Sequence, residues 1–294
     1  MYYVVKYAIF SLLIILTISK ASECLTHFWP PDERSIVKEH TINLDLAPED
    51  RWTEIMREHK RIFVVFVGKL KDHVINLLGL KESFFQKYEK FMISQVEKTW
   101  PSEYMREMKG ISKAVDLHES YIISVNIIFD FISLCVSAAQ YDSDIDDVVH
   151  VRNLDFGAMF GWDYDNSKWI INECIQPLLI TVNFKSKGVT QYRSVTFAGC
   201  VGVLTGMRPN AFAISINARI SVKGGFSGMM DHFYKIDNNQ SFISLATREI
   251  LAKSRDYETA VNARLCTHFV ICRISSIKMS LIKILLIKFN KIKL

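Results

Sequence analysis

The chain has 294 residues and a formal net charge of +5, but its excess of basic residues lies at the two ends. Two lysines fall within residues 1–21, and six basic residues with no acidic one fall within residues 266–294. The remainder has 28 basic and 31 acidic residues, a net charge of −3, and no basic patch with interleaved aromatic residues. We therefore expect no binding of nucleic acid.

The cysteines and histidines exclude two further kinds of protein. The six cysteines form no CxxC pair and are too sparse for a disulfide-rich scaffold. They are Cys24, Cys135, Cys174, Cys200, Cys266 and Cys272. The eight histidines are scattered, and neither HExxH nor CxxC followed by histidine occurs. The sequence therefore predicts no metal site and no cofactor.

The N-terminus has the pattern of an export signal. Lys6 precedes an apolar run over residues 8–18, and the small residues Ser19 and Ala21 follow it. The run is shorter than the roughly 20 apolar residues that a membrane span requires. We expect residues 1–21 to be a signal peptide cleaved after Ala21, with an uncleaved membrane anchor as the alternative.

Residues 22–134 are predicted to be mainly helical. A short strand comes first, because residues 41–46 alternate apolar and polar side chains. Pro48 and the two acidic residues after it mark the start of a helix, since proline suits the first turn and acidic side chains there complement the helix dipole. Helical spacing of apolar residues then continues to Pro101, which interrupts it, and resumes afterwards.

The pattern changes at Cys135. Four later segments are rich in β-branched residues, alternate in polarity and are separated by Gly, Asn and Pro, which is typical of successive antiparallel strands. They are VVHVRNLDF, LLITVNFK, YRSVTFAGCVGVLTG and AFAISINARISV. A helical segment at residues 242–265 follows. Residues 266–294 are atypical, with only basic charges and no Gly or Pro, and they fit either an amphipathic, membrane-seeking helix or translated non-coding sequence.

Cys135 begins this β-rich part, and three roles are open to it. The common role is that of a buried structural cysteine. A papain-like nucleophile is excluded, because Val136 and Ser137 do not fit that signature. The third role is an N-terminal nucleophile: cleavage before Cys135 frees an α-amine, whose pKa of about 7.7–8 suits it as the base for its own thiol.

An N-terminal nucleophile also needs groups that orient the amine and stabilise developing charge. Arg152 and Asp155, three residues apart on or near the next predicted strand, have the chemistry for both tasks. Arginine and aspartate at this spacing are common, so the spacing alone does not decide the role of Cys135.

The order of motifs from residue 24 to about residue 265 resembles the acid ceramidase family, which also includes N-acylethanolamine-hydrolysing acid amidase. The matching segments are TINLDL.P..RW (41–52), EMKGI (107–111), the region of Cys135, H.RNLDFG (150–157), FAG.VG.LTG..P (197–209) and the glycine pair 224–225. The stretch FGAMFGWDYDNSKWIINECIQPL is more similar to the ceramidase branch.

This resemblance implies an α+β fold, a truncated form of the αββα sandwich of N-terminal-nucleophile hydrolases. It implies a precursor that cleaves itself between Leu134 and Cys135. The products are a helical α-chain, residues 22–134, and a β-chain, here residues 135–265, which stay associated.

The resemblance also implies the chemistry of the site. The catalytic residues of the family fall on Cys135, Arg152 and Asp155, and the reaction is hydrolysis of ceramide, or of another N-acyl lipid, through a thioester. The family further implies a route through the secretory pathway to the lysosome or to secretion, and a saposin-type activator. Asn239 begins an Asn-Gln-Ser sequon, which predicts glycosylation in an exported protein.

The resemblance ends near residue 265. The TNYD-type and DDRR motifs of the family do not occur, so the β-chain is expected to be incomplete. Cys24 matches a family cysteine whose disulfide partner lies in the missing part. Two alternatives therefore stand beside a ceramidase: a truncated, catalytically inactive relative that binds lipid or a partner, and an N-acylethanolamine acid amidase.

Overall fold

A computed structural model describes most of the chain after residue 36. The described residues are 37–79, 81, 86–87, 90–91, 93–94, 96–97, 100–131, 134–144, 147–155, 161–163, 167–218, 242–266 and 282–288. The chain divides into two units, Met1–Lys38 and Glu39–Leu294, and every element below belongs to the second. The predicted signal peptide, Cys24 and the sequon at Asn239 lie outside the described residues.

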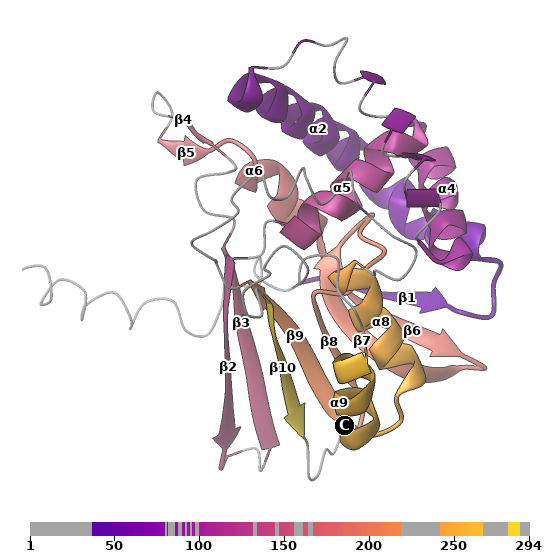
Figure 1. Cartoon of the computed structure of the whole chain (residues 1–294), viewed down its shortest axis with the longest axis vertical. Helices are drawn as coiled ribbons and strands as arrows, with labels where there is room; N and C mark the ends of the chain where they lie inside the picture. Colours follow the sequence, from indigo (N-terminus) through magenta and orange to yellow (C-terminus); the bar gives the residue numbers. More distant parts are fainter. Residues whose placement is uncertain are drawn as a thin grey trace, which may run out of the picture. The chain divides into compact units, whose positions relative to one another are not determined.

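The first part of the second unit is helical, apart from one strand. Strand β1 (Glu39–Asn43) leads into the 3-10 turn η3 (Pro48–Asp50), and helices α2, α4 and α5 follow. Their bounds are Thr53–Leu78, Ser102–Val115 and Glu119–Phe131. Helix α4 begins directly after Pro101, as the sequence predicted, because proline cannot continue a preceding helix. Figure 1 shows these three helices grouped at one end of the strands.

The main sheet has six strands in the order β1-β6-β7-β8-β9-β10. The bounds of its last five strands are Leu179–Ser186, Val189–Phe197, Thr205–Arg208, Phe212–Ala218 and Ile282–Lys288. Neighbours from β6 onward are antiparallel, as predicted, whereas β1 pairs with β6 in parallel. Strand β10 comes from the atypical tail, so the helical alternative for that tail is wrong for residues 282–288, which extend the sheet beside β9.

A separate hairpin forms a second β layer. It consists of β2 (Leu134–Asp142) and β3 (Asp147–Asp155), which pair with each other along their whole length. Small elements follow: β4 (Trp162–Asp163), β5 (Lys168–Trp169), α6 (Asn172–Ile175) and η5 (Gln176–Leu178). Helices α8 (Ile243–Lys253) and α9 (Tyr257–Cys266) come after β9 in the chain.

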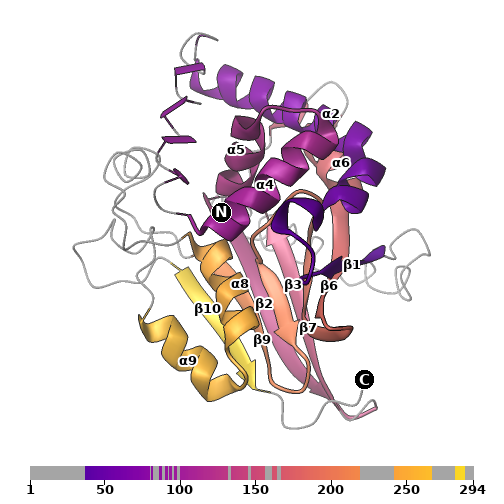
Figure 2. The same cartoon turned by 90° about the vertical axis from the view of Figure 1, so that its right-hand side faces the viewer.

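Two neighbouring residues of β8 show that helices and hairpin lie on opposite faces of the main sheet. A side chain at Gly206 would meet Leu251 Cδ1 of α8 at 2.6 Å. The hydroxyl of Thr205, which points to the other face because strand residues alternate, accepts a hydrogen bond from Arg152 of β3. The layers therefore run helix, sheet, sheet, which confirms the α+β class; Figure 2 shows α8 along the strands.

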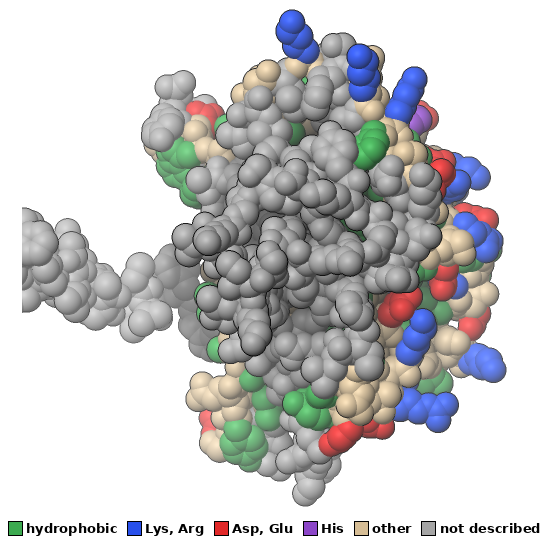
Figure 3. Space-filling view, in the orientation of Figure 1, with side chains coloured by type: hydrophobic (Ala, Val, Ile, Leu, Met, Phe, Trp, Pro, Cys, Tyr) green, Lys and Arg blue, Asp and Glu red, His purple; other side chains and the backbone are tan. Residues whose placement is uncertain are grey.

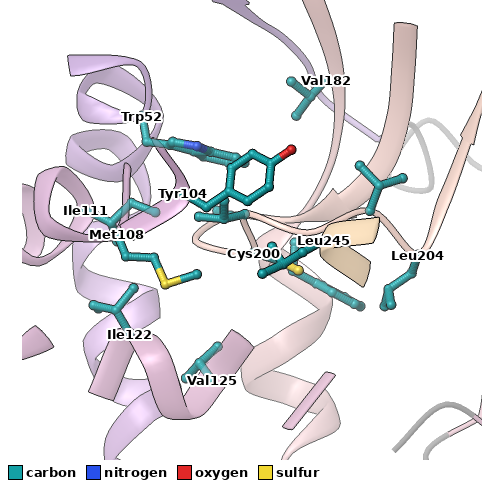
Figure 4. Close-up of a cluster of buried hydrophobic side chains, with 14 of the residues drawn as sticks. Trp52, Tyr104, Met108, Ile111, Ile122, Val125, Val182, Cys200, Leu204 and Leu245 are labelled. Carbon is teal, nitrogen blue, oxygen red and sulfur yellow. The ribbon is translucent and has the colours of Figure 1, made fainter. Parts of the chain in front are cut away.

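A continuous apolar core fills the space between the helices and the main sheet. Trp52 and Met108 contribute from the helical side, and Val182 from β6, each at most 1% exposed. Figure 4 shows how these side chains converge with others from α5, α8 and the segment after β7. Asn126 of α5 fixes that segment, since its amide donates to the Gly199 carbonyl at 2.9 Å and its side-chain oxygen accepts from Val201 N at 2.7 Å.

One ion pair is enclosed by this core. Arg248 of α8 donates to both carboxylate oxygens of Glu107 of α4, at 2.6 and 2.8 Å, and both residues are at most 1% exposed. Trp52 Nε1 and Arg51 Nη1 donate to the same carboxylate at 2.8 and 2.9 Å. Arg248 also donates to Tyr192 OH of β7 at 3.0 Å. These bonds satisfy a charge that would otherwise be costly to bury.

A glycine brings the helix that carries Glu107 close to the preceding turn. A side chain at Gly110 would lie 1.9 Å from the Glu49 carbonyl oxygen of η3. No other residue fits there without moving the backbone, because the atom that it would meet belongs to the main chain rather than to a flexible side chain. The EMKGI motif thus supplies both the buried charge and the close approach of the helix that carries it.

Glu107 is ionised although it is buried. Burial alone raises the pKa of a carboxyl, but the charge of Arg248 and the hydrogen bonds from Arg248, Trp52 and Arg51 outweigh it, and the pKa of Glu107 is lowered. A lowered folded-state pKa contributes stability above the unfolded-state pKa, and that contribution is lost as pH falls through the folded-state value. The network therefore keeps its charge under mildly acidic conditions.

We predict that Glu107→Gln lowers the free energy of unfolding by about 3–5 kcal/mol, because it leaves the Arg248 charge buried without its partner. Urea denaturation followed by circular dichroism measures this loss. The matched control is Glu249→Gln, which removes the exposed pair of Glu249 with Lys253 at 3.2 Å and should cost less than about 0.5 kcal/mol. Equal losses in the two variants would contradict the central role of the buried pair.

Candidate active site

The β2–β3 hairpin brings the three predicted catalytic positions to one end of a two-stranded sheet. Leu134 pairs with Asp155, Cys135 with Leu154 and Ser137 with Arg152. The switch from helix to strand that the sequence predicted at Cys135 falls between Phe131, the end of α5, and Leu134, the start of β2. The backbone positions of Cys135 and Asp155 are described, whereas their side chains lie outside the described part of the structure.

Arg152 joins the hairpin to the main sheet. One terminal nitrogen of its guanidinium donates to the Thr205 hydroxyl of β8, and the other donates to the Ile216 carbonyl of β9. Thr205 is held in turn, because its own carbonyl accepts a hydrogen bond from Ser194 Oγ at 2.9 Å. A planar guanidinium with several fixed donors suits such a two-point contact, which lysine cannot reproduce.

A row of small polar side chains attaches β2 to the same sheet. Ser215 Oγ of β9 donates to Ser137 Oγ at 3.0 Å, and Ser137 Oγ donates to Asn217 Oδ1 at 3.0 Å. Ser137 lies two residues after Cys135, so positions 135 and 137 share one face of the strand. These bonds therefore fix the distance between β2 and β9 next to the position of Cys135.

A cleft of about 650 Å³ opens between β3 and the main sheet. Its volume is in the range of small-molecule sites, about 300–1,000 Å³. Apolar side chains make up most of its surface, and its polar groups include His150 and Arg152 of β3 and Thr205 of β8. The other lining residues are Leu154, Trp169, Asn172, Ile175, Gln176, Leu179, Val195 and Phe197. The arrangement suits a ligand with a long apolar part and a polar group near Arg152.

His150 faces this cleft in an electropositive setting. Burial lowers the pKa of its imidazole, and the nearby charge of Arg152 lowers that pKa further. The ring is therefore uncharged over a wider pH range than a free histidine. Its place in the cleft wall suits it for contact with a ligand.

Exposed hydrophobic side chains surround the mouth of the cleft and the outer face of the hairpin. Trp162 and Trp169 of the β4–β5 hairpin stack edge to face, 5.1 Å between ring centroids, and are 39% and 37% exposed. Val136 and Val151 are 70% and 56% exposed. Figure 3 shows hydrophobic side chains where β2 to β5 lie, whereas Lys and Arg project from the side of α2, α4 and β1.

No helix among the described residues has the length and apolar character needed to cross a membrane.

Sequence reasoning missed the residues that hold the site together. Ser215 and Asn217 carry no local signal of their role, because their partner lies on β2, far away in the sequence. Thr205 lies in the matched motif at 197–209, but that motif does not indicate its contact with Arg152 of β3. Ser137 had one signal, its place two residues after the predicted nucleophile. Cys174 and Cys200 are buried and form no disulfide.

Comparison with known proteins supports the resemblance inferred from the motifs. A family model described as the beta subunit of N-acylethanolamine-hydrolyzing acid amidase matches residues 35–92. Acid ceramidase of Homo sapiens is 32% identical over 243 residues, which cover 82% of this chain and 60% of the human protein. Acid ceramidases of Pan troglodytes and Mus musculus are 33% and 29% identical, covering 82% of this chain and 60% and 61% of those proteins.

Among solved structures, the Caenorhabditis elegans N-acylethanolamine-hydrolyzing acid amidase (NAAA) ortholog is 30% identical, with 44% of this chain and 47% of that chain covered. Its TM-score of 0.33 is too low to compare the two arrangements in space. The sequence matches, by contrast, extend over most of this chain, which spans about 60% of the length of the curated relatives. The chain is therefore a homologue of the acid ceramidases over about 60% of their length.

Proposed function

We propose that the chain carries the catalytic residues of a lipid amidase that hydrolyses the amide bond of ceramide to sphingosine and a fatty acid. The observation that carries the proposal is the likeness to acid ceramidases over 82% of this chain. The β2–β3 register supports it, since Cys135, Arg152 and Asp155 come to the same end of the hairpin, beside an apolar cleft. We propose Cys135 as the nucleophile, with Arg152 and Asp155 as its partners.

The nucleophile requires one preparatory step, which is cleavage of the peptide bond between Leu134 and Cys135. The Cys135 thiol attacks the Leu134 carbonyl carbon, the peptide nitrogen leaves as the new α-amine, and water then hydrolyses the thioester. The products are residues 22–134, which end in a carboxylate, and a β-chain that begins with Cys135. Both positions lie in β2, with Leu134 opposite Asp155, so the bond is held in an extended conformation beside a carboxylate-bearing residue.

Amide hydrolysis then follows the same chemistry with the lipid as substrate. The α-amine of Cys135 takes the thiol proton, and the thiolate attacks the carbonyl carbon of the amide. The sphingosine amine leaves with a proton, and the acyl group remains on the sulfur. Water attacks this thioester and releases the fatty acid. Arg152 suits the role of stabilising charge on the carbonyl oxygen, because its guanidinium is fixed by Thr205 and Ile216.

The cleft supports an N-acyl lipid as the substrate class. Leu179, Val195 and Phe197 offer an apolar wall for an acyl or sphingoid chain, while Arg152 offers a cation near the reacting amide. Exposed Trp162 and Trp169 near the mouth suit delivery of substrate from an apolar surface. A saposin-type activator, a lysosomal or secreted location and glycosylation at Asn239 belong to the same proposal.

Two alternatives to a ceramidase involve the same residues but predict either a different lipid substrate or no catalysis. An N-acylethanolamine amidase is favoured by the family model that matches residues 35–92, and comparison of turnover of ceramide with that of an N-acylethanolamine separates it from a ceramidase. The second alternative is a catalytically inactive relative that binds lipid or a partner. It would bind N-acyl lipid without cleavage of the chain or of the lipid.

The first prediction of this proposal concerns cleavage of the chain. Incubation of the purified protein at mildly acidic pH should yield a fragment that begins with Cys135, detected by mass spectrometry of the N-termini. Cys135→Ala should remain intact, because it has no thiol to attack the peptide bond. Cys174→Ala is the matched control and should be cleaved like the unaltered chain, since Cys174 is buried and free.

Ceramide turnover should appear only after this cleavage. If Cys135→Ala is cleaved at the same bond, Cys135 is not the nucleophile. If the folded, unaltered chain stays intact and inactive but binds ceramide, the inactive relative is the correct description. Circular dichroism of each variant separates these results from a failure to fold.

The second prediction concerns Arg152. Thr205→Val should slow both cleavage and turnover by about tenfold or more, because a hydrogen bond to a charged group contributes about 1.5–3 kcal/mol and its loss leaves the guanidinium less well fixed. Thr196→Val is the matched control: Thr196 is buried on the opposite face of the same sheet, and its hydroxyl has no hydrogen-bond partner among the described residues. If the two variants are cleaved and turn over substrate at equal rates, Thr205 does not contribute to the function of Arg152.

A further inference from the structure

A second group of reactive side chains lies outside the proposed active site, where β1 meets α2. His40 of β1 lies beside Glu58 and His59 of α2, and one potential ligand atom from each lies within 4.8 Å of the others. It is the one such group of metal-ligating side chains in the described part of the chain. The sequence predicted no metal site because the histidines are scattered, but folding brings these two from different elements to one place.

The fold determines how the two histidines present their nitrogen atoms. His59 is 7% exposed and lies on the apolar side of α2 that faces the core. Its Nδ1 atom is 2.8 Å from the Ile55 carbonyl oxygen one turn earlier, so Nδ1 carries the proton and donates it. The Nε2 atom of His59 is then the one with a lone pair available to a metal. This orientation by a backbone carbonyl is the usual second-shell arrangement of metal-binding histidines.

His40 meets His59 from the strand. The two rings make an edge-to-face contact with centroids 5.5 Å apart, and the Nε2 atom of His40 is shielded from solvent. Glu58 is exposed and completes the group from the solvent side. One buried imidazole, one partly buried imidazole and one exposed carboxylate thus already lie close together.

We propose that His40, Glu58 and His59 bind a zinc ion. Two imidazoles with one carboxylate are a frequent zinc ligand set, with bond lengths of about 2.0–2.2 Å and a fourth position for water. The ligands of a tetrahedral zinc are about 3.3 Å apart at such bond lengths. Binding therefore requires the ligand atoms, now within 4.8 Å of one another, to move closer, and the exposed Glu58 side chain can rotate toward the histidines.

The position of the site gives the bound ion a structural effect. Among the described strands β1 pairs only with β6, in parallel, and α2 packs on the core beside it. An ion shared by His40 and the two α2 residues links the strand to the helix. It stabilises the folded state by an amount that grows with the logarithm of the zinc concentration relative to the Kd. Imidazole binds metal only when it is unprotonated, so zinc should leave as the pH becomes acidic.

The test uses the full chain, freed of metal with a chelator and then titrated with zinc chloride at pH 7.5 and pH 5. Isothermal titration calorimetry should give one saturable site at pH 7.5 and no such site at pH 5. The melting temperature at pH 7.5 should rise by about 5 °C at a zinc concentration 100 times the Kd. Cys135→Ala should bind equally well, which excludes the predicted nucleophile as the zinc ligand.

Two pairs of variants locate the ion. Glu58→Gln should weaken binding by about tenfold or more, since even the groups that orient metal ligands contribute 10–100-fold. Glu54→Gln, on the same exposed side one turn earlier, should leave the affinity unchanged. His40→Gln should abolish the calorimetric site, while His73→Gln, further along α2, should retain it. In both variants a polar glutamine replaces the histidine. The melting temperature measured without zinc therefore reports any loss of stability that the substitution itself causes.

The proposal is overturned by either of two results. One is the absence of a saturable zinc site at pH 7.5 in the folded chain. The other is a site whose affinity is the same in Glu58→Gln and His40→Gln as in their controls, which would place the ion elsewhere. Neither result bears on cleavage before Cys135, so the zinc site and the proposed amidase stand or fall separately.

Discussion

The ion pair between Glu107 and Arg248 is the interaction on which the rest of the structure depends. It sits in the apolar core between α4, α8 and the main sheet, where an unpaired charge would be costly, and two further donors from the start of α2 complete it. The guanidinium also lies over the rings of Tyr104 and Phe184, at 4.8 and 4.9 Å from their centroids. Such a fully satisfied network fixes the mutual position of three elements that apolar packing alone would leave free to slide.

This network spans the proposed cleavage site. Glu107 and Trp52 precede Cys135 in the sequence, whereas Arg248 and Tyr192 follow it, and all four meet in one core. Cleavage before Cys135 would cut one peptide bond in β2 and leave the core contacts in place. The same holds for the parallel pairing of β1 with β6 and for the Asn183 amide that donates to Glu39 at 2.5 Å. A precursor of this design can mature without separating its parts, because the stabilising contacts lie away from the bond that is cut.

The sequence predicted those features that depend on local patterns. The break at Pro101, the antiparallel strands β6 to β9 and the change from helix to strand at Cys135 follow from spacing and from proline. The parallel partner of β1, the contribution of β10 and the pairing of Glu107 with Arg248 depend on residues far apart, and no local pattern encodes them. For the candidate site, the motif order suggested Cys135, Arg152 and Asp155, but Thr205 and Asn217 emerged only from the packing of two β layers.

The packing of those layers explains how one small hairpin can carry the chemistry. A two-stranded sheet is marginally stable in water, so β2 and β3 depend on what they pack against. Short polar contacts through Ser137 hold β2 close to β9, while the long side chain of Arg152 holds β3 at a greater distance from β8. The unequal spacing leaves the cleft on the β3 side, where Val195 and Phe197 form its floor. The floor strands are themselves supported from the opposite face by the core around Arg248, because the Tyr192 hydroxyl of β7 accepts a hydrogen bond from Arg248. The position of the proposed nucleophile and the shape of the cleft thus follow from the lengths of two side chains on one hairpin. That hairpin packs against a sheet whose other face is fixed by a buried charge.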